Sequence, residues 1–140
     1  MTARQSRRVS VFFYGLFMDP ELLRAKGLEP KNARRAGVRG MRLRIGERAA
    51  LEPATDGVVY GMLFESTQEE IERLYSEPSV APYRPEAVLA EPEAGEPLAA
   101  LCYNLPSGPS SHEPDLEYVR KLRELATRLS LPASYVSSIG

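Results

Sequence analysis

The segment from Val9 to Met18 constrains the fold most, because an apolar run leads directly into a Tyr-Gly pair and the start of a helix. A strand that ends in glycine at a helix entrance leaves backbone N–H groups unpaired and lets a ligand approach the peptide closely. Such turns often hold a small anion or a carbonyl oxygen. We therefore expect any small-molecule site to open around Tyr14 and Gly15, the alternative being an ordinary buried strand end.

The composition fits one domain and restricts the available chemistry. The chain has 140 residues, 43% of them hydrophobic and 26% charged, with a net charge of −1. Residues 1–140 are expected to form one domain around one core, with residues 1–8 as a flexible N-terminus. Cys102 is the only cysteine and His112 the only histidine, which nearly excludes disulfides, zinc sites and His-supported nucleophiles. Chemistry must come from carboxylates, hydroxyls, arginines and backbone, and the sequence gives no evidence of a metal or an organic cofactor.

Membrane and nucleic-acid functions are both disfavoured. No run approaches the roughly 20 apolar residues that a membrane span needs, and the first residues do not lead into a signal-peptide core, so we expect a cytoplasmic protein. Basic residues crowd between Lys31 and Arg48, but this run has no aromatic residue and the whole chain is slightly acidic, unlike typical nucleic-acid-binding domains. Between Gly40 and Gly46 apolar and basic residues alternate, which predicts a strand with one solvated face. No sequence feature specifies an oligomeric state.

Strand signals recur along the chain with short connections and no internal repeat. Strands are expected over residues 9–14, 38–46, 58–64, 83–90 and 97–105, the last two as a hairpin. Residues 52–57 are expected to form a loop that ends in a turn. Gly61, inside a strand, predicts a bend, a bulge or a close approach of another backbone segment.

Helix signals lie between these strands. A short helix is expected after Asp19, with Pro20 at its first position and Gly27 at its end. Thr67 and Glu70 predict a capping box for a second helix. The longest helix is expected over residues 115–129, after a connection over 106–114, and a last helical turn follows Pro132. The apolar stripe of the longest helix consists of Leu116, Val119, Leu122, Leu125 or Ala126, and Leu129.

The order of these elements predicts the fold class. Strands outnumber helices and do not alternate strictly with them, and no GxGxxG motif is present, so a Rossmann-like sheet is disfavoured. We expect an α+β fold in which a small mixed β-barrel or curved sheet is flanked by α-helices.

Several short motifs in a fixed order resemble the gamma-glutamylcyclotransferase-like family, which includes the AIG2-like proteins. The resemblance covers residues 9–105 and extends to the tail around Tyr118 and Tyr135. It rests on the following segments: Tyr14-Gly15-x-x-Met18, Val59-Tyr60-Gly61-Met62-Leu63-Phe64, Leu74-Tyr75-Ser76-Glu77 and Tyr83-Arg84. It implies a mixed barrel with a substrate cavity between the Tyr-Gly turn and the segment that carries the glutamate.

The resemblance also implies a reaction. The α-amino group of a γ-glutamyl compound attacks its own γ-carbonyl, which gives 5-oxoproline and releases the amine without a protein nucleophile. The protein must orient the substrate, take a proton and stabilise the oxyanion. By resemblance Glu77 is the general base, and the substrate-binding residues are Tyr14, Gly15, Leu16, Phe17 and Tyr83.

Alternatives remain at the level of sequence. The family pattern Leu-Asp-x-x-Glu-Gly is replaced here by Leu74-Tyr75-Ser76-Glu77-Pro78, and Leu16 and Phe17 make the turn more apolar than a glutathione site requires. Glu77 could instead be solvated, and Glu86 is a second candidate base. The two competing functions are a cyclotransferase that acts on a small γ-glutamyl substrate and a catalytically inactive member that binds a small ligand or a protein.

Overall fold

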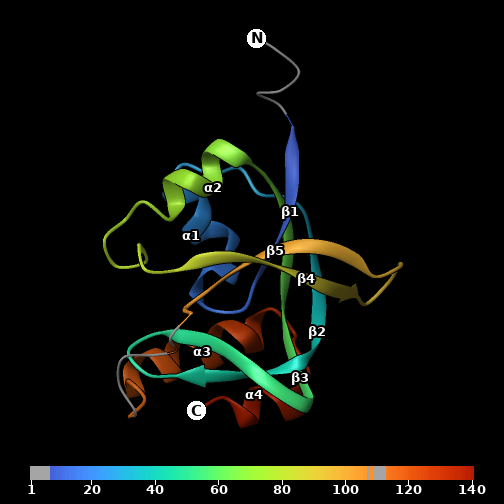
Figure 1. Ribbon diagram of the computed structural model, residues 1–140. Coiled ribbons are helices and arrows are strands. Elements are labelled where there is room, and N and C mark those ends of the chain that lie inside the picture. Colours follow the sequence, from blue (N-terminus) through green and yellow to red (C-terminus); the bar gives the residue numbers. More distant parts are fainter. Residues whose placement is uncertain (1–6, 107, 109–112) are drawn as a thin grey trace.

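The computed structural model describes residues 7–106, 108 and 113–140. Within them the chain folds as an α+β protein whose strands close into one barrel in the order β1-β3-β2-β4-β5 (Figure 1). Neighbouring strands are antiparallel, except that β1 meets β5 in parallel at Val11 and Leu101. The expected small mixed barrel is confirmed. Its strands are β1 (Arg8–Phe13), β2 (Lys31–Ile45), β3 (Ala49–Thr67), β4 (Arg84–Pro92) and β5 (Leu98–Asn104).

Two expected connections fall largely outside this description. Residues 1–6 of the expected flexible N-terminus are not among the described residues, whereas Arg8 already belongs to β1. Most of the expected connection over 106–114, with His112, also lies outside them. The expected hairpin is confirmed, because β4 and β5 pair antiparallel from Arg84 and Asn104 onward.

The loop expected over residues 52–57 is wrong, because these residues belong to the continuous strand β3. The register between β2 and β3 shifts between Arg39 and Met41, where Gly40 adopts a φ of +84°. Arg39 pairs with Val58 and Met41 pairs with Pro53, so residues 54–57 of β3 bulge out opposite Gly40. A Cβ on Gly57 would stand 2.2 Å from the Met41 carbonyl oxygen. Residues that predict a turn in isolation lie within a strand here, because β3 takes them up as a bulge and pairs with β2 on both sides of it.

The close approach expected at Gly61 is confirmed. A Cβ at this position would lie 2.2 Å from the carbonyl oxygen of Phe13, and Phe13 pairs with the neighbouring Met62 across β1 and β3. Only a residue without a side chain lets the two strands approach this closely.

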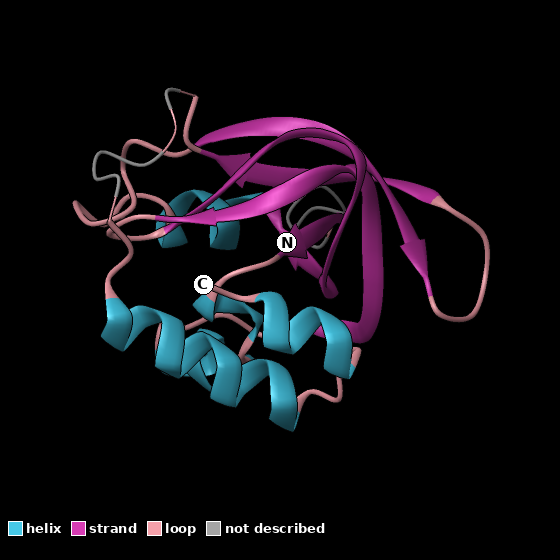
Figure 2. Cartoon of the chain, turned by 90° about the horizontal axis from the view of Figure 1, so that it is seen from below, coloured by secondary structure: helices cyan, strands magenta, loops and turns pink. Residues whose placement is uncertain are grey.

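Helices cover the outside of the barrel (Figure 2). They are α1 (Pro20–Ala25), α2 (Gln68–Leu74), α3 (Leu116–Arg128) and α4 (Ala133–Ser138), with a 3₁₀ turn at Leu16–Met18. In Figure 1, α1 and α2 lie at one end of the barrel, and α3 and α4 lie together at the other.

Local capping signals set the helix ends as the sequence predicts. The Asp19 carboxylate accepts a hydrogen bond from the Glu21 N–H at the start of α1. Thr67 and Glu70 form the expected capping box of α2. Within α3 one expected stripe residue is wrong: Leu116 is 76% exposed, because it occupies the first helical position beside the solvent-exposed cap Asp115. The buried residues of α3 are Val119, Leu122, Leu125 and Ala126.

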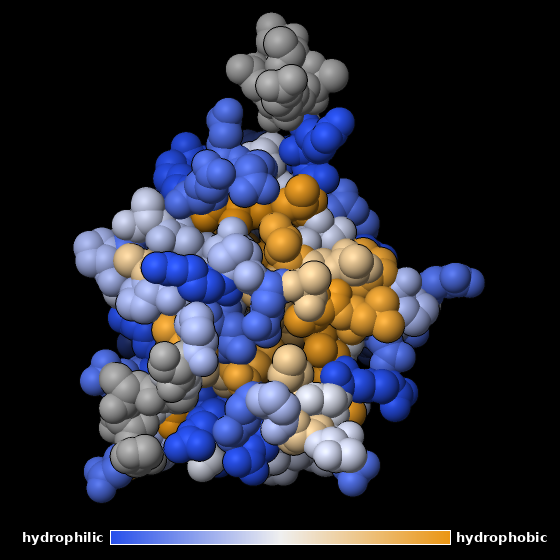
Figure 3. All heavy atoms as spheres, in the orientation of Figure 1, coloured by the Kyte–Doolittle hydropathy of each residue, from blue (hydrophilic) through white to orange (hydrophobic). Residues whose placement is uncertain are grey.

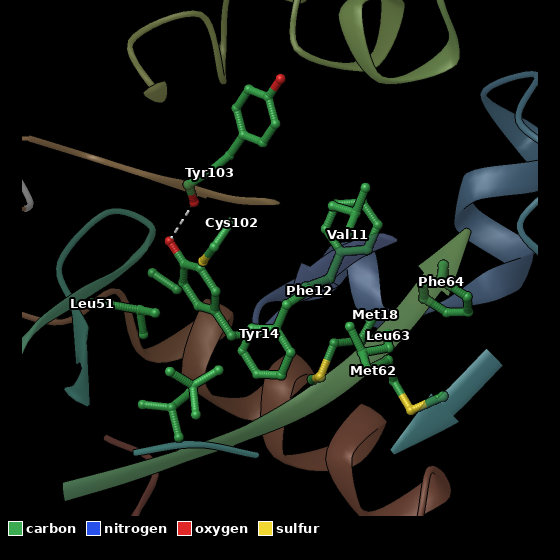
Figure 4. Close-up of a cluster of buried hydrophobic side chains, with 14 of the residues drawn as sticks. Val11, Phe12, Tyr14, Met18, Leu51, Met62, Leu63, Phe64, Cys102 and Tyr103 are labelled. Carbon is green, nitrogen blue, oxygen red and sulfur yellow. Dashed lines mark hydrogen bonds between the residues drawn. The ribbon is translucent and has the colours of Figure 1, made fainter. Parts of the chain in front are cut away.

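A buried amide at the end of β5 joins this strand to β3. Asn104 is 8% exposed; its Nδ2 donates to the Leu51 carbonyl oxygen at 3.0 Å, and its Oδ1 accepts the Leu51 N–H at 2.8 Å. This side chain therefore pairs with the beginning of β3 as a strand residue would. Beside it the Tyr14 hydroxyl donates to the Tyr103 carbonyl oxygen at 2.9 Å (Figure 4). Every polar group of this buried network thus has a partner, as burial demands.

Four arginines of β2 face solvent as expected and pair with glutamates, in the ion pairs Arg35–Glu93, Arg39–Glu91, Arg42–Glu52 and Arg44–Glu52. For Arg34 the expected solvated position is wrong, because its Nε is buried without a hydrogen-bond partner among the described residues. Figure 3 shows hydrophilic side chains around an apolar area on the face that the β4–β5 hairpin crosses, and Leu89 of this hairpin is 61% exposed. In the described part of the chain no helix has the length and apolar character to cross a membrane.

Packing of α3 against the barrel can be tested at Leu122, whose side chain is 0% exposed. Leu122→Ala is expected to lower the free energy of unfolding by about 2–5 kcal/mol, because it removes buried methyl groups and leaves a cavity. Urea denaturation measures this change. Leu116→Ala, on the exposed side of the same helix, is the matched control and should change stability little. Equal losses in the two variants would contradict the assignment of the buried face.

The Asn104 amide can be tested with Asn104→Leu, a change of similar volume that leaves the Leu51 N–H and carbonyl groups without their partner. We expect a loss of stability of about 1–3 kcal/mol for each group left unpaired. Hydrogen exchange of the Leu51 amide, followed by NMR, should become faster than that of other β3 amides. Unchanged protection of Leu51 would show that the Asn104 amide does not hold the beginning of β3 in place.

Candidate active site

One cavity of about 260 Å³ contains most of the residues that the sequence singled out. The turn Gly15–Phe17, Tyr14, Tyr83 and Glu77 all line it. These residues come from the end of β1, from the segment after α2 and from the entry into β4. The structure therefore brings together the candidate base and all five candidate substrate-binding residues.

Space, rather than backbone torsion, explains the glycine of the Tyr-Gly turn. Gly15 has a φ of −112°, which other residues can adopt. A Cβ here would stand 2.7 Å from the Tyr118 hydroxyl oxygen. The N–H groups of Leu16 and Ala49 face the same oxygen; burial raises the pKa of Tyr118, and these groups partly offset the rise. Tyr118 thus ties α3 to the turn and to the start of β3.

The turn continues into the 3₁₀ helix with apolar side chains. Phe17 packs edge-on against Phe13 and Tyr75, with ring centroids 6.0 and 5.7 Å apart. The Phe17 N–H stands at the beginning of this short helix, where a helix offers it no partner of its own, whereas the Leu16 N–H faces Tyr118. The turn therefore presents a backbone donor beside an aromatic wall.

Glu77 lies three residues beyond the end of α2, in a run of tight turns. The Val80 N–H donates to the Glu77 carbonyl oxygen, and the Tyr83 N–H donates to the Val80 carbonyl oxygen, both at 3.0 Å. The Glu77 carboxylate accepts a hydrogen bond through Oε1 from Lys26 Nζ at 2.7 Å, and the Glu77 side chain is 39% exposed. Glu77 is therefore held at the edge of the cavity and is neither sealed inside nor directed into bulk solvent.

Five tyrosines are among the described residues that line the cavity, and hydrogen bonds and stacking hold several of them in place. The Tyr83 hydroxyl donates to the Ala49 carbonyl oxygen, and the ring of Tyr75 stacks on that of Tyr103 with centroids 4.0 Å apart. Burial raises the pKa of Tyr14, of Tyr75 and of Tyr83. At neutral pH these hydroxyls are uncharged, so the wall carries no negative charge of its own.

Two residues with reactive side chains lie outside this cavity. Glu86 is exposed on β4 and faces a different hollow, where Asn104 Nδ2 donates to its Oε1 at 3.4 Å. The structure does not bring Glu86 to the Tyr-Gly turn, so the alternative base expected from the sequence is not part of this site. Cys102 is 0% exposed, and burial raises the pKa of its thiol to about 12.

The sequence analysis did not assign several of the cavity-lining residues to the site. Lys26 follows α1, and Arg48 follows the alternating stretch that predicted a solvated strand face. Tyr75 and Tyr103 come from the segment after α2 and from β5. Their place in one cavity follows from barrel closure, which no local pattern reveals. For Tyr118 a signal existed, since the segment around it is part of the family resemblance.

Comparison with protein-family models finds a match over most of the chain. The family model described as "Gamma-glutamyl cyclotransferase, AIG2-like" matches residues 11–122. This range runs from the second half of β1 through the Tyr-Gly turn and Glu77 to the first half of α3. Comparison with curated proteins finds no match.

Solved structures share the fold at low sequence identity. A structure titled "Gamma-glutamyl cyclotransferase" superposes with a TM-score of 0.80 at 16% identity, covering 96% of this chain and 89% of the other. YkqA from Bacillus subtilis superposes with a TM-score of 0.74 at 22% identity, and the match covers 93% of this chain and 52% of YkqA. The uncharacterized protein loc79017 from Homo sapiens superposes with a TM-score of 0.72 at 15% identity, and the match covers 96% of this chain and 89% of the other. At these identities the likeness concerns the fold alone.

The tight contact between Gly15 and Tyr118 can be tested by a double-mutant cycle. Gly15→Ala is expected to destabilise the protein by about 1–3 kcal/mol, because the new Cβ displaces the Tyr118 hydroxyl. In a Tyr118→Phe background, which lacks that hydroxyl, the cost of Gly15→Ala should be largely relieved. Thermal unfolding of the four proteins gives the coupling energy. Additive effects would show that the two residues do not compete for space.

Proposed function

Because the chain belongs to the gamma-glutamyl cyclotransferase, AIG2-like family, we propose that it cyclises the γ-glutamyl group of a small amide or amino-acid conjugate to 5-oxoproline. The amine is the second product. One observation carries this proposal: the Glu77 carboxylate, the Gly15–Phe17 turn and Tyr83 line a single cavity. A base, backbone donors and an aromatic wall are the groups that such a cyclisation needs.

Glu77 acts as the general base in this proposal. Lys26 occupies Oε1 of its carboxylate, which leaves Oε2 to receive the α-ammonium group of the substrate. Since a partly exposed ion pair contributes little energy, the ammonium of a substrate can also compete with Lys26. The α-nitrogen loses a proton to Glu77 and attacks the γ-carbonyl carbon, forming the ring bond. The amide C–N bond then breaks, and the protons lost by the α-nitrogen end on the departing amine.

The turn and the tyrosines complete the proposed chemistry. As the α-nitrogen attacks, negative charge develops on the carbonyl oxygen, and the Phe17 N–H at the start of the 3₁₀ turn can stabilise it. The rings of Tyr75 and Tyr83, 6.2 Å apart between centroids, restrict the volume in which a bent substrate fits. Holding the substrate bent favours ring closure, because the reacting atoms must approach each other within one molecule.

A second candidate function is favoured by one specific contact. The hydrogen bond from Lys26 to Glu77 occupies part of the carboxylate that the reaction requires. A family member that kept the cavity but bound its ligand without turnover would tolerate this contact. Release of 5-oxoproline distinguishes the two functions directly.

The test is a mass-spectrometric assay for 5-oxoproline released from γ-glutamyl amino acids, γ-glutamyl amines and glutathione. Wild type should turn over at least one of these compounds, and Glu77→Gln should reduce kcat by about 10²–10⁴-fold, the usual contribution of a general base. Glu86→Gln, which changes a carboxylate outside the cavity, is the matched control and should retain activity. Activity that survives in Glu77→Gln would refute this assignment of the base, and no turnover on any compound would favour the binding function.

A further inference from the structure

Arg48 is a cation on the cavity wall to which neither the sequence nor the proposed reaction assigns a role. It lines the same cavity as Glu77 and the Tyr-Gly turn. It belongs to the turn between β2 and β3, where the Gly46 N–H donates to the Arg48 carbonyl oxygen at 3.0 Å. The Asp115 N–H at the start of α3 donates to the Gly46 carbonyl oxygen at 2.8 Å. Arg48 therefore projects from a turn that hydrogen bonds fix on both sides.

Most other arginines of the same hairpin have carboxylate partners, whereas Arg48 has none within the described residues. Arg42 and Arg44 both pair with Glu52 on the outside of the barrel. The guanidinium of Arg48 instead lies near the hydroxyls of Tyr83 and Tyr118, where its charge counteracts the rise in their pKa. These hydroxyls are neutral and cannot balance a positive charge, so a ligand anion is the natural counter-ion.

The charges of the cavity are separated in a way that matches an amino-acid head group. Glu77 pairs with Lys26 and forms no ion pair with Arg48, although both line the cavity. The charge of Arg48 acts on Tyr83 and Tyr118, whereas the Glu77 carboxylate is held by Lys26, which follows α1. The cation and the carboxylate are thus held by different parts of the cavity wall. An α-carbon that carries both a carboxylate and an ammonium group would satisfy the two sites together.

We infer that Arg48 binds the α-carboxylate of the γ-glutamyl group, so that the cavity selects ligands that carry a free carboxylate at that carbon. The identity of the ligand rests on the proposed function. Guanidinium groups bind carboxylates with two parallel hydrogen bonds, which fixes orientation as well as affinity. The α-ammonium then points toward Glu77, and the N–H group of Phe17 remains available for the γ-carbonyl oxygen.

Binding of the product ring tests this role without requiring turnover. The probes are 5-oxo-L-proline and 5-oxo-L-prolinamide, which differ only in that a neutral amide replaces the carboxylate. NMR titration should show that wild type binds the acid about 10- to 100-fold more tightly than the amide, the range expected for a hydrogen-bonded charge pair. In Arg48→Gln this ratio should fall close to one, and Arg48→Lys should retain part of it. Arg42→Gln, in the same hairpin but outside the cavity, should behave as wild type.

Three results would overturn the inference: an unchanged ratio in Arg48→Gln, a ratio close to one in wild type, or no binding of either ring. A fourth result would place Arg48 beside the leaving group instead. In that case the binding ratio for the two rings persists in Arg48→Gln, and kcat/KM falls for γ-glutamyl-L-alanine but not for γ-glutamylethylamine. Arg48 would then bind the carboxylate of the released amino acid. The proposed function fails separately, by the absence of 5-oxoproline release, and the binding ratio then still decides the role of Arg48.

Discussion

The side-chain amide of Asn104 joins the parts of the barrel from which the cavity is built. It pairs with Leu51 near the start of β3 through both a donor and an acceptor. Its Oδ1 also lies 3.4 Å from the Tyr14 hydroxyl, which itself bonds to Tyr103. The end of β1, the beginning of β3 and the end of β5 thus meet at one buried polar group. Since an unpaired polar group in this position would be costly, the three segments are held in one arrangement.

The cavity built on this rigid frame carries few charged groups, and these lie apart from one another on its wall. Its wall is mostly aromatic, and burial keeps the tyrosine hydroxyls neutral by raising the pKa of Tyr14, Tyr75 and Tyr83. Charged groups enter only at separate places on the wall, from Lys26, Arg48 and Glu77. In surroundings of low polarity each of these charges acts more strongly on a ligand than it would in water. A small domain with a single histidine can therefore still orient a zwitterionic compound.

Sequence was a good guide wherever the determining contacts are local. The caps at Asp19 and Thr67 depend on residues two or three positions away, and both form as predicted. Residues 54–57 form a bulge within β3, and only the pairing with β2 on both sides makes them part of a strand, so local turn signals were misleading there. Glu77 and Tyr83 were proposed through the family resemblance, and both line the cavity. Arg48 was missed because its neighbours are surface arginines, and only the closed barrel distinguishes it from them.

The long strand β3 also has a consequence for how chains of this kind can vary in length. It begins directly after Arg48 and ends at the cap of α2, the helix that leads to Glu77. Because β1 and β2 both fix its register, one inserted residue would turn every later side chain to the opposite face. The turn over residues 93–97 instead projects from the barrel at the tip of the β4–β5 hairpin (Figure 1). Insertions and deletions should therefore accumulate in that hairpin turn, while β3 keeps a constant length.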